Sequence, residues 1–353
     1  MRTISKISLV LVFLSAISVG CTKKTGMNLN TSLKQAVYQS ASDLNTAVSN
    51  LSSTKAFTIL TMSSGSLKSA TTTDATYKVH ITLDTIKGLY QYKPANRPDK
   101  WGWSLIKFFK KTAASSNMIV QMPLSKITNS KTLRQYNSSD TTLANNFQIA
   151  VSDYHNNYNS YWDYDYINTS EISIDNKVAG NLNIKSIISP TNGIQYSSSY
   201  IFSGSYTAKY AYNSGDTTVS SFSILSGSDL LYQEKLLTVR NDTARFGREN
   251  QYVLTIGNVT LVRKAGSSSV FVDGILQPDA TVSVVDKAAE SEASVCHKRD
   301  IQITFEDGTT TTVSALIGKS IDNMATLFDS LHSVYFAAYV VDWIAYDVYY
   351  GRN

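Results

Sequence analysis

The feature that most constrains the fold is a long succession of extended segments between residues 147 and 263, in which apolar and polar residues alternate. This alternation predicts strands at residues 147–154, 161–174, 181–188, 195–212, 217–225, 231–240 and 251–263. The links between them, such as residues 175–180 and 213–216, are rich in turn residues and too short to hold a helix. Long strands joined in this way form an antiparallel meander.

Shorter extended segments flank this region. On the N-terminal side the pattern predicts strands at residues 79–83, 86–92, 103–111 and 117–122, with an irregularity at Gly88 and a hairpin loop at residues 113–116. On the C-terminal side it predicts strands at residues 269–276 and 300–305, a tight turn at 306–308 and a return strand at 309–313. The 22 tyrosines and only five prolines suit a strand-rich protein.

Two segments carry a helical pattern. Within residues 31–51 the apolar residues recur at spacings of four and three, at Val37, Ala41, Leu44, Val48 and Leu51. From Ser320, a plausible N-cap, a second apolar stripe continues through Ile321, Met324, Phe328, Leu331, Tyr335 and Ala338. The tail at residues 334–350 is nearly all apolar or aromatic apart from Asp342 and Asp347, which is consistent with a helix buried on most sides or with a core strand.

These elements predict an α+β protein that is mainly β. We expect a large curled antiparallel meander sheet, shaped as a half-barrel or an open sandwich, with an N-terminal and a C-terminal helix packed on it. Its 353 residues exceed the ~250 to 300 at which one core usually stops growing, so one large or two modest domains are expected, with a subdivision near residue 265.

The N-terminus has the layout of a secretory signal. Arg2 and Lys6 precede an apolar run at residues 7–19, which ends in the small residue Gly20 followed by Cys21. Thirteen apolar residues fall short of the roughly 20 that a membrane-spanning helix needs. The segment is therefore expected to direct export and not to span the membrane.

The residues before Cys21 resemble the lipobox of bacterial lipoproteins, although Ser18 stands where that family usually has a large aliphatic residue. The resemblance implies a signal peptide at residues 1–20, cleavage before Cys21, and a diacylglycerol thioether and further acylation, for example by palmitate, at that cysteine. Residues 21–30 then form a lipid-anchored tether and residues 31–353 the body. Because no acidic residues follow the cysteine, we expect the periplasmic face of the outer membrane and not the cell surface.

The sequence contains no recognisable catalytic or cofactor motif. It lacks a Gly-x-Ser-x-Gly elbow, a phosphate-binding glycine loop, a His-Glu-x-x-His and a Cys-x-x-Cys. The adjacent Cys296 and His297 have no neighbouring ligand cluster, so we expect a solvated loop there and no metal. The sequence predicts no cofactor and no enzymatic activity, a hydrolase with paired carboxylates being the third alternative. The net charge of +5 is too weak and dispersed to predict nucleic-acid binding.

One aromatic stretch, residues 154–166, is a candidate ligand-binding site. If residues 161–166 form a strand, Trp162, Tyr164 and Tyr166 share one face, and Asp163 and Asp165 share the other. Together with the nearby Tyr158, rings beside polar side chains suit the stacking and hydrogen bonding that sugars offer. The alternative is a hairpin whose aromatic residues only pack on the sheet.

These observations leave two classes of function. The first is a non-catalytic binding lipoprotein, whose curved sheet holds a lipid or other apolar ligand, or whose aromatic strand holds a glycan. The second is a structural or assembly lipoprotein, which pairs with an envelope protein through an exposed sheet edge.

Overall fold

The computed structural model describes residues 32–62, 78–93, 108–127, 143–240, 247–264, 266–286, 299–318, 320–332 and 336–351. The chain divides into two units, Met1–Ser32 and Leu33–Asn353, and the fold described here is that of the second. Cys21 with its predicted lipobox, and the pair Cys296 and His297, lie outside the described residues.

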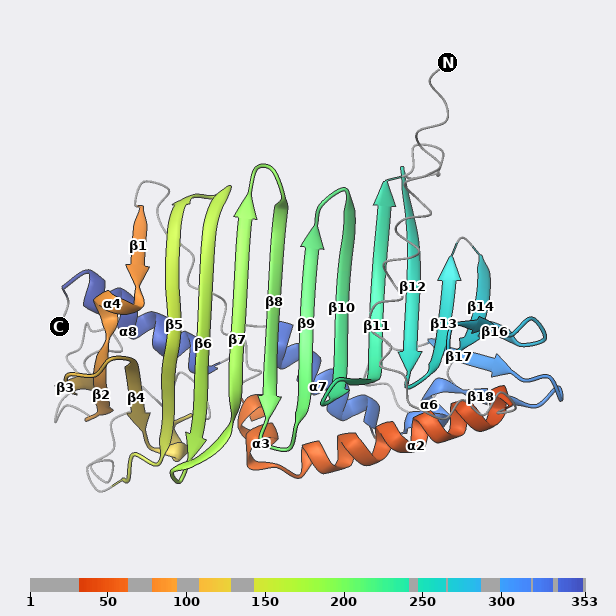
Figure 1. Cartoon of the computed structure of the whole chain (residues 1–353), viewed down its shortest axis with the longest axis horizontal. Helices are drawn as coiled ribbons and strands as arrows, with labels where there is room; N and C mark the ends of the chain where they lie inside the picture. The colour runs from red at the N-terminus through yellow and green to blue at the C-terminus, as the bar shows by residue number, and fades with distance from the viewer. Residues whose placement is uncertain are drawn as a thin grey trace, which may run out of the picture. The chain divides into compact units, whose positions relative to one another are not determined.

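One large open sheet dominates the second unit. Ten consecutive strands, β5 to β14, form an antiparallel meander in chain order (Figure 1). Among the described residues, the sheet that contains this meander has 15 strands in all. The meander strands are β5 (Phe147–Ser160), β6 (Asp163–Ile174), β7 (Lys177–Ser189), β8 (Gly193–Phe202), β9 (Tyr206–Ser214), β10 (Thr217–Ser226), β11 (Asp229–Arg240), β12 (Arg248–Ile256), β13 (Val259–Lys264) and β14 (Ser267–Val272). The predicted fold class, mainly β with a wide open sheet and terminal helices, is confirmed.

Three predicted strands are in fact hairpins. Residues 195–212 divide into β8 and β9, residues 251–263 into β12 and β13, and residues 269–276 into β14 and the two-residue β15 (Ile275–Leu276). The turns use left-handed backbone at Ser205, Gly257, and Asp273 with Gly274. Such turns are so short that the alternation of apolar and polar residues continues through them, so the pattern alone merged each pair.

The N-terminal strands are ordered differently from the prediction. The hairpin expected at residues 113–116 does not join neighbours, because β2 (Gly88–Tyr92) lies between β3 (Phe109–Ala113) and β4 (Met118–Met122). β2 pairs antiparallel with β3 but parallel with β4, which makes the sheet mixed. The irregularity predicted at Gly88 is present as a positive φ of 147°, next to a register shift at Leu89 and Tyr90.

Strand β5 is long enough to pair with two strands along one side. Its first part pairs with β4, at Phe147 to Val151, and its later part pairs with β1 (Val79–Thr82), at His155 to Tyr158. The predicted extension of β1 to Leu83 is wrong, because α4 (Leu83–Ile86) begins there with Thr82 and Thr85 forming a capping box.

The helices occupy one face and one end of this sheet. The predicted N-terminal stripe is confirmed in α2 (Leu33–Ser52), which buries all five of its stripe residues and packs against β11, β12 and β13; α3 (Lys55–Met62) follows it. The predicted C-terminal stripe is divided between two helices, α7 (Ser320–His332) and α8 (Phe336–Tyr349), which cross behind the strands in Figure 1. Of the two structures that the sequence left open for the tail, a buried helix and a core strand, the helix is the one present, as α8.

A second, small sheet lies beyond β14. It contains β16 (Thr281–Asp286), β17 (Arg299–Thr304) and β18 (Thr310–Thr312), followed by α6 (Val313–Ile317). The sequence predicted β17, the turn and a return strand, but it missed β16, and it extended the return strand over residue 313, where α6 begins.

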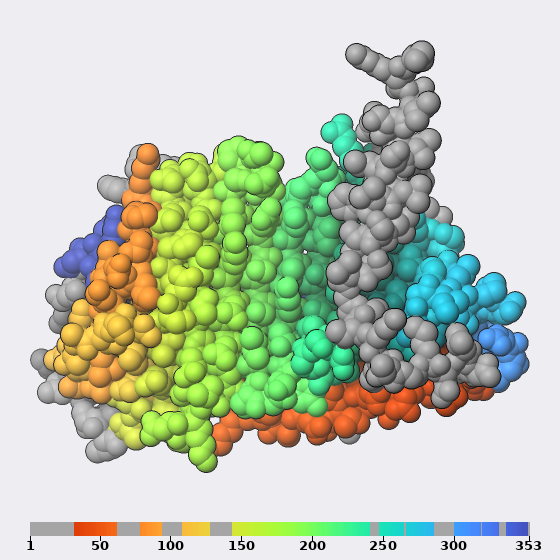
Figure 2. All heavy atoms as spheres, viewed as in Figure 1, coloured from red at the N-terminus to blue at the C-terminus, as the bar shows by residue number. Residues whose placement is uncertain are grey.

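The two faces of the large sheet differ because helices pack on only one of them. The helix face carries Ile184, Ser198, Tyr210 and Phe222 in one cross-strand row, all of them buried. The outer face carries Asn183, Ser199, Lys209 and Ser223 in the corresponding row. Figure 2 views the outer face, where strands β5 to β9 form a broad surface with no helix over it.

Candidate functional site at the β5–β6 hairpin

The candidate site begins at the tip of the hairpin formed by β5 and β6. Tyr161 and Trp162 form the turn, and the backbone N–H of Trp162 donates to Ser160 Oγ at 3.3 Å. The register shifts between Tyr158 and Ser160, so Asn159 is the extra residue of a bulge. Bulges redirect side chains and recur beside binding sites, which fits the projection of two large rings from this turn.

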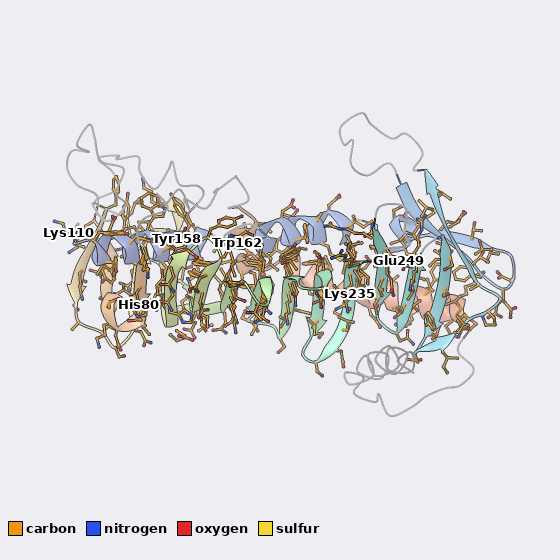
Figure 3. The ribbon with its side chains drawn as sticks, turned by 90° about the horizontal axis from the view of Figure 1, so that it is seen from above. His80, Lys110, Tyr158, Trp162, Lys235 and Glu249 are labelled. Atoms are coloured by element: carbon orange, nitrogen blue, oxygen red, sulfur yellow. The ribbon has the colours of Figure 1, made fainter. Side chains whose placement is uncertain are left out.

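These two rings are the most exposed of the large apolar side chains that the structure describes. Tyr161 is 68% exposed and Trp162 is 60% exposed. Their centroids lie 4.9 Å apart with an interplanar angle of 89°, so each ring supports the other edge to face. Figure 3 shows Trp162 and Tyr158 on the same side of the sheet as the helices, opposite His80.

Below the tip, tyrosine rings continue toward the interior. Tyr158 and Tyr164 are half-buried with centroids 6.4 Å apart, and Tyr164 stacks on Tyr166 at 6.2 Å and 12°. Tyr166, which is only 6% exposed, meets Tyr154 edge to face at 5.9 Å. We call these four residues, Tyr154, Tyr158, Tyr164 and Tyr166, the tyrosine ladder. It connects the exposed tip with a buried polar cluster.

The buried end of the ladder is a carboxylate supplied by α8. Asp342 Oδ1 accepts hydrogen bonds from the hydroxyls of Tyr154, at 3.1 Å, and Tyr166, at 3.0 Å. The Tyr166 hydroxyl accepts in turn from Asn168 Nδ2 at 3.3 Å, and Asn168 Oδ1 accepts from Ser170 Oγ at 2.5 Å. Such a network fixes α8 on the sheet with defined geometry, because each buried polar group holds a neighbour in place.

Burial changes the acidity of this cluster. Desolvation raises the pKa of Asp342 to about 7, although the hydrogen bonds from Tyr166 and Tyr154 act in the opposite direction. Desolvation also raises the pKa of the tyrosines around it: well above the ordinary range for Tyr154 and Tyr166, and to about 12 for Tyr346, whose hydroxyl accepts from Asn156 Nδ2 at 3.3 Å. The tyrosines stay neutral near pH 7, whereas Asp342 changes its charge there.

The outer face of the same two strands carries a separate polar group. His155 Nε2 lies 3.1 Å from Asp165 Oδ1, but it has no aligned hydrogen bond, and Asn157 Oδ1 is buried without a hydrogen-bond partner. His80 pairs across β1 with Asn157 on this face. Among the described residues, no group of three His, Cys, Asp or Glu side chains is placed to hold a metal ion.

The four residues predicted as a ligand site lie near one another but differ in access. Tyr158, Tyr164 and Tyr166 belong to one ladder, and Trp162 stands at its exposed end. Tyr166 offers no free surface to a ligand, because its ring is buried and its hydroxyl is bonded to Asp342. The prediction missed Asp342 as a partner; the available signal was that Asp342 is one of only two carboxylates in the apolar tail.

Comparisons of this chain with protein-family models, curated proteins and solved structures give no significant match. Within the part of the chain that the structure describes, no helix is both long and apolar enough to cross a bilayer.

Proposed function

We propose that this protein is a non-catalytic, lipid-anchored protein of the cell envelope that binds a glycan at the β5–β6 hairpin. The observation that carries the proposal is the exposed pair of Tyr161 and Trp162, which stands at the end of the tyrosine ladder. Amphipathic rings of this kind stack on the apolar faces of sugar rings while polar neighbours bind the hydroxyl groups. The bulged Asn159 and the exposed Asp163 beside the turn supply such polar groups.

The tyrosine ladder supports binding by keeping the tip rigid. A ligand that stacks on freely moving rings must order them, which costs affinity. Here the hairpin is tied to the core below it, since Tyr164 stacks on Tyr166 and Tyr166 bonds to Asp342. The site therefore needs little reorganisation on binding.

A membrane surface is a weaker candidate for the same tip. The carboxylates of Asp163 and Asp165 lie on the strand that follows the turn, and they repel anionic phospholipid headgroups. A glycan without negative charge meets no such repulsion, so a neutral polysaccharide is the better ligand.

Two alternatives receive less support. A lipid held in a concave face needs an open cavity, but buried side chains such as Tyr200, Phe202 and Ala208 fill the helix face where α7 packs. Assembly through a sheet edge needs an accessible strand, but β3 carries Lys110 and Lys111, and β15 has only two residues. Charged and very short edge strands disfavour pairing with another chain.

The test is affinity electrophoresis of the full chain in gels that contain a neutral soluble polysaccharide, with dextran, glucomannan and arabinoxylan as probes. We expect at least one of them to retard the wild-type protein, and Trp162→Ala to abolish this retardation with little change in Tm, because the side chain is mostly exposed. Tyr349→Ala is the matched control, since Tyr349 is also exposed, at 40%, but lies on α8.

Equal retardation of wild type and Trp162→Ala, or a large loss of Tm, would contradict a binding role for the tip. The tip would be assigned to the membrane instead if no polysaccharide retards the wild-type protein, and if the wild type binds phosphatidylglycerol vesicles while Trp162→Ala does not. The anchoring part of the proposal is tested separately: Cys21→Ser is expected to abolish incorporation of labelled palmitate and to release the protein from the membrane fraction.

A further inference from the structure

A narrow slot lies where the helix face of β12 and β13 meets the small sheet. Its volume is about 250 Å³, and its walls are formed by Tyr252, Leu261, Val262 and Arg263 on one side and by Val282, Val284, Asp300 and Ile301 on the other. The two sheets are packed closely at one end, where Ile303 is buried at 2% exposure, while Val284 and Ile301 are only half-buried. The slot is thus the part of the interface that the described side chains do not fill.

The walls of the slot are mainly apolar. Leu261 and the ring of Tyr252 face Val284 and Ile301 across it. The cross-strand register places Leu236 beside Tyr252, and Leu236 is 45% exposed although it points to the helix face. An apolar track therefore runs from Leu236 on β11 into the slot, and covering this track would be favourable.

One cation stands at the rim. Arg263 follows Tyr252 in the same cross-strand row, is exposed, and has no hydrogen-bond or ion-pair partner among the described residues. Asp300 in the opposite wall keeps its negative charge, but its carboxylate accepts from both the backbone N–H and the hydroxyl of Ser314 in α6, so a ligand carboxylate is expected only on the Arg263 side of the slot. The Tyr252 hydroxyl is likewise used, since it donates to Glu234 Oε1 at 3.0 Å.

From this arrangement we infer that the slot binds a small amphipathic carboxylate, with its aliphatic chain between the two sheets and its carboxylate on the guanidinium of Arg263. A guanidinium binds a carboxylate through two parallel hydrogen bonds, and apolar walls of this kind bind a hydrocarbon chain. The volume lies just under the range of about 300 to 1,000 Å³ for drug-sized ligands, so a chain of medium length fits better than a phospholipid.

A second cavity differs from the slot in the character of its walls. It has a volume of about 340 Å³ beside α3 and the β6–β7 turn. Its walls contain the charged side chains of Lys55, Asp175 and Lys177, of which Lys55 and Asp175 pair with each other at 3.2 Å. The slot, in contrast, has mainly apolar walls with the single cation Arg263 at its rim, which suits a ligand with a hydrocarbon chain and one negative charge. This inference does not depend on the glycan proposal, because the slot and the hairpin tip are built from different strands.

The experiment measures binding of octanoate to the full chain by isothermal titration calorimetry, with octan-1-ol as the uncharged probe of equal length. Arg263→Gln is expected to weaken octanoate binding at least tenfold and to leave octan-1-ol binding unchanged, because only the charged contact is lost. Val284→Phe is expected to weaken binding of both probes by filling the slot. Lys209→Gln, which removes an exposed cation from the outer face, is the control and should change neither.

Two results would overturn the inference. One is the absence of saturable octanoate binding to the wild-type protein. The other is octanoate binding that Arg263→Gln and Val284→Phe leave unchanged while both variants keep the wild-type circular dichroism spectrum. Arg263 is exposed, so its substitution is not expected to impair folding, and the charged contact is testable even if Val284→Phe is destabilised.

Discussion

Helices α7 and α8 lie on the same face of the same sheet, but they contact it through different chemistry. Phe328 of α7 meets the rings of Tyr210 and Phe222 edge to face, at 5.4 and 5.8 Å. α8 instead places the carboxylate of Asp342 against two tyrosine hydroxyls. The first contact is stabilised by burial of apolar surface, whereas the second depends on how a buried acid is protonated.

The difference has a thermodynamic consequence. Apolar burial is insensitive to pH, so the α7 contact should contribute equally at all pH values at which the protein is folded. The buried carboxylate has a pKa of about 7, against an ordinary value of 3.8, so the α8 contact should weaken as Asp342 ionises. The α7 contact and the α8 contact are therefore expected to respond differently to the same change of pH.

Replacing Asp342 tests whether the α8 contact, unlike the α7 contact, depends on pH, and it is expected to change the free energy of unfolding the most. Between about pH 4 and pH 7 the folded protein holds a proton that the unfolded chain releases, so stability falls as pH rises through this window, by on the order of 4 kcal/mol. Asp342→Asn cannot ionise, yet its carbonyl still accepts from both tyrosines. We expect the variant to be more stable than wild type at pH 8 by up to that amount, already more stable by about 1.5 to 2 kcal/mol at pH 5, and similar to it only below about pH 4.

Urea unfolding at the two pH values measures this effect. Asp229→Asn, at the exposed start of β11, is the control and should change stability little at either pH. The two described acids with lowered pKa do not interfere. The pKa of Asp307 is lowered by bonds from Thr309 and Lys34 and that of Asp175 by bonds from Asn146 and Lys55, so both carboxylates titrate below the window. A wild-type protein whose stability does not fall between pH 5 and pH 8 would show that Asp342 is ionised throughout.

The α7 contact was largely predictable from the sequence, whereas the α8 contact was not. The stripe that includes Met324, Phe328 and Leu331 marks the buried side of α7 with a helical period, and the alternation along β9 and β10 marks the sheet face that receives it. Local periodicity is enough here because any apolar side chain can pack against any other.

The polar contact depends on specific partners that lie far apart in the chain. Tyr154 and Asp342 are 188 residues apart, and no local pattern states which strand faces which helix. The same limit explains the order β3–β2–β4, since strand adjacency was inferred from the length of the loops. The aromatic stretch at residues 154–166 could be recognised as a candidate site, but its division into an exposed tip and a buried ladder depends on α8.

The substitution Phe328→Ala tests the apolar contact between α7 and the sheet. Removing the ring should cost about 3 kcal/mol, because its contacts with Tyr210 and Phe222 are lost and the helices cannot fully close the gap. The loss should be the same at pH 5 and pH 8, measured by urea unfolding as for Asp342→Asn. A loss that differs between the two pH values by more than about 1 kcal/mol would show that the α7 contact is coupled to the ionisation of Asp342.

The substitution Tyr166→Phe is expected to have the smallest effect on stability. It tests the polar contact between Asp342 of α8 and the sheet most directly. This change removes one of the two donors to Asp342 and leaves Asn168 Nδ2 without its acceptor, at a cost of about 1 to 2 kcal/mol. The lost bond favours the ionised carboxylate, so its removal should raise the pKa of Asp342 further. The fall in stability then begins at the same pH, which the unfolded carboxyl sets, but continues to higher pH. Tyr212→Phe, a half-buried tyrosine of β9 with no hydrogen bond from its hydroxyl among the described residues, should shift neither quantity. If Tyr166→Phe lowers stability without extending its fall to higher pH, then the Tyr166 hydroxyl contributes only packing and neutral hydrogen bonding, and the pKa of Asp342 is set by burial and by the bond from Tyr154.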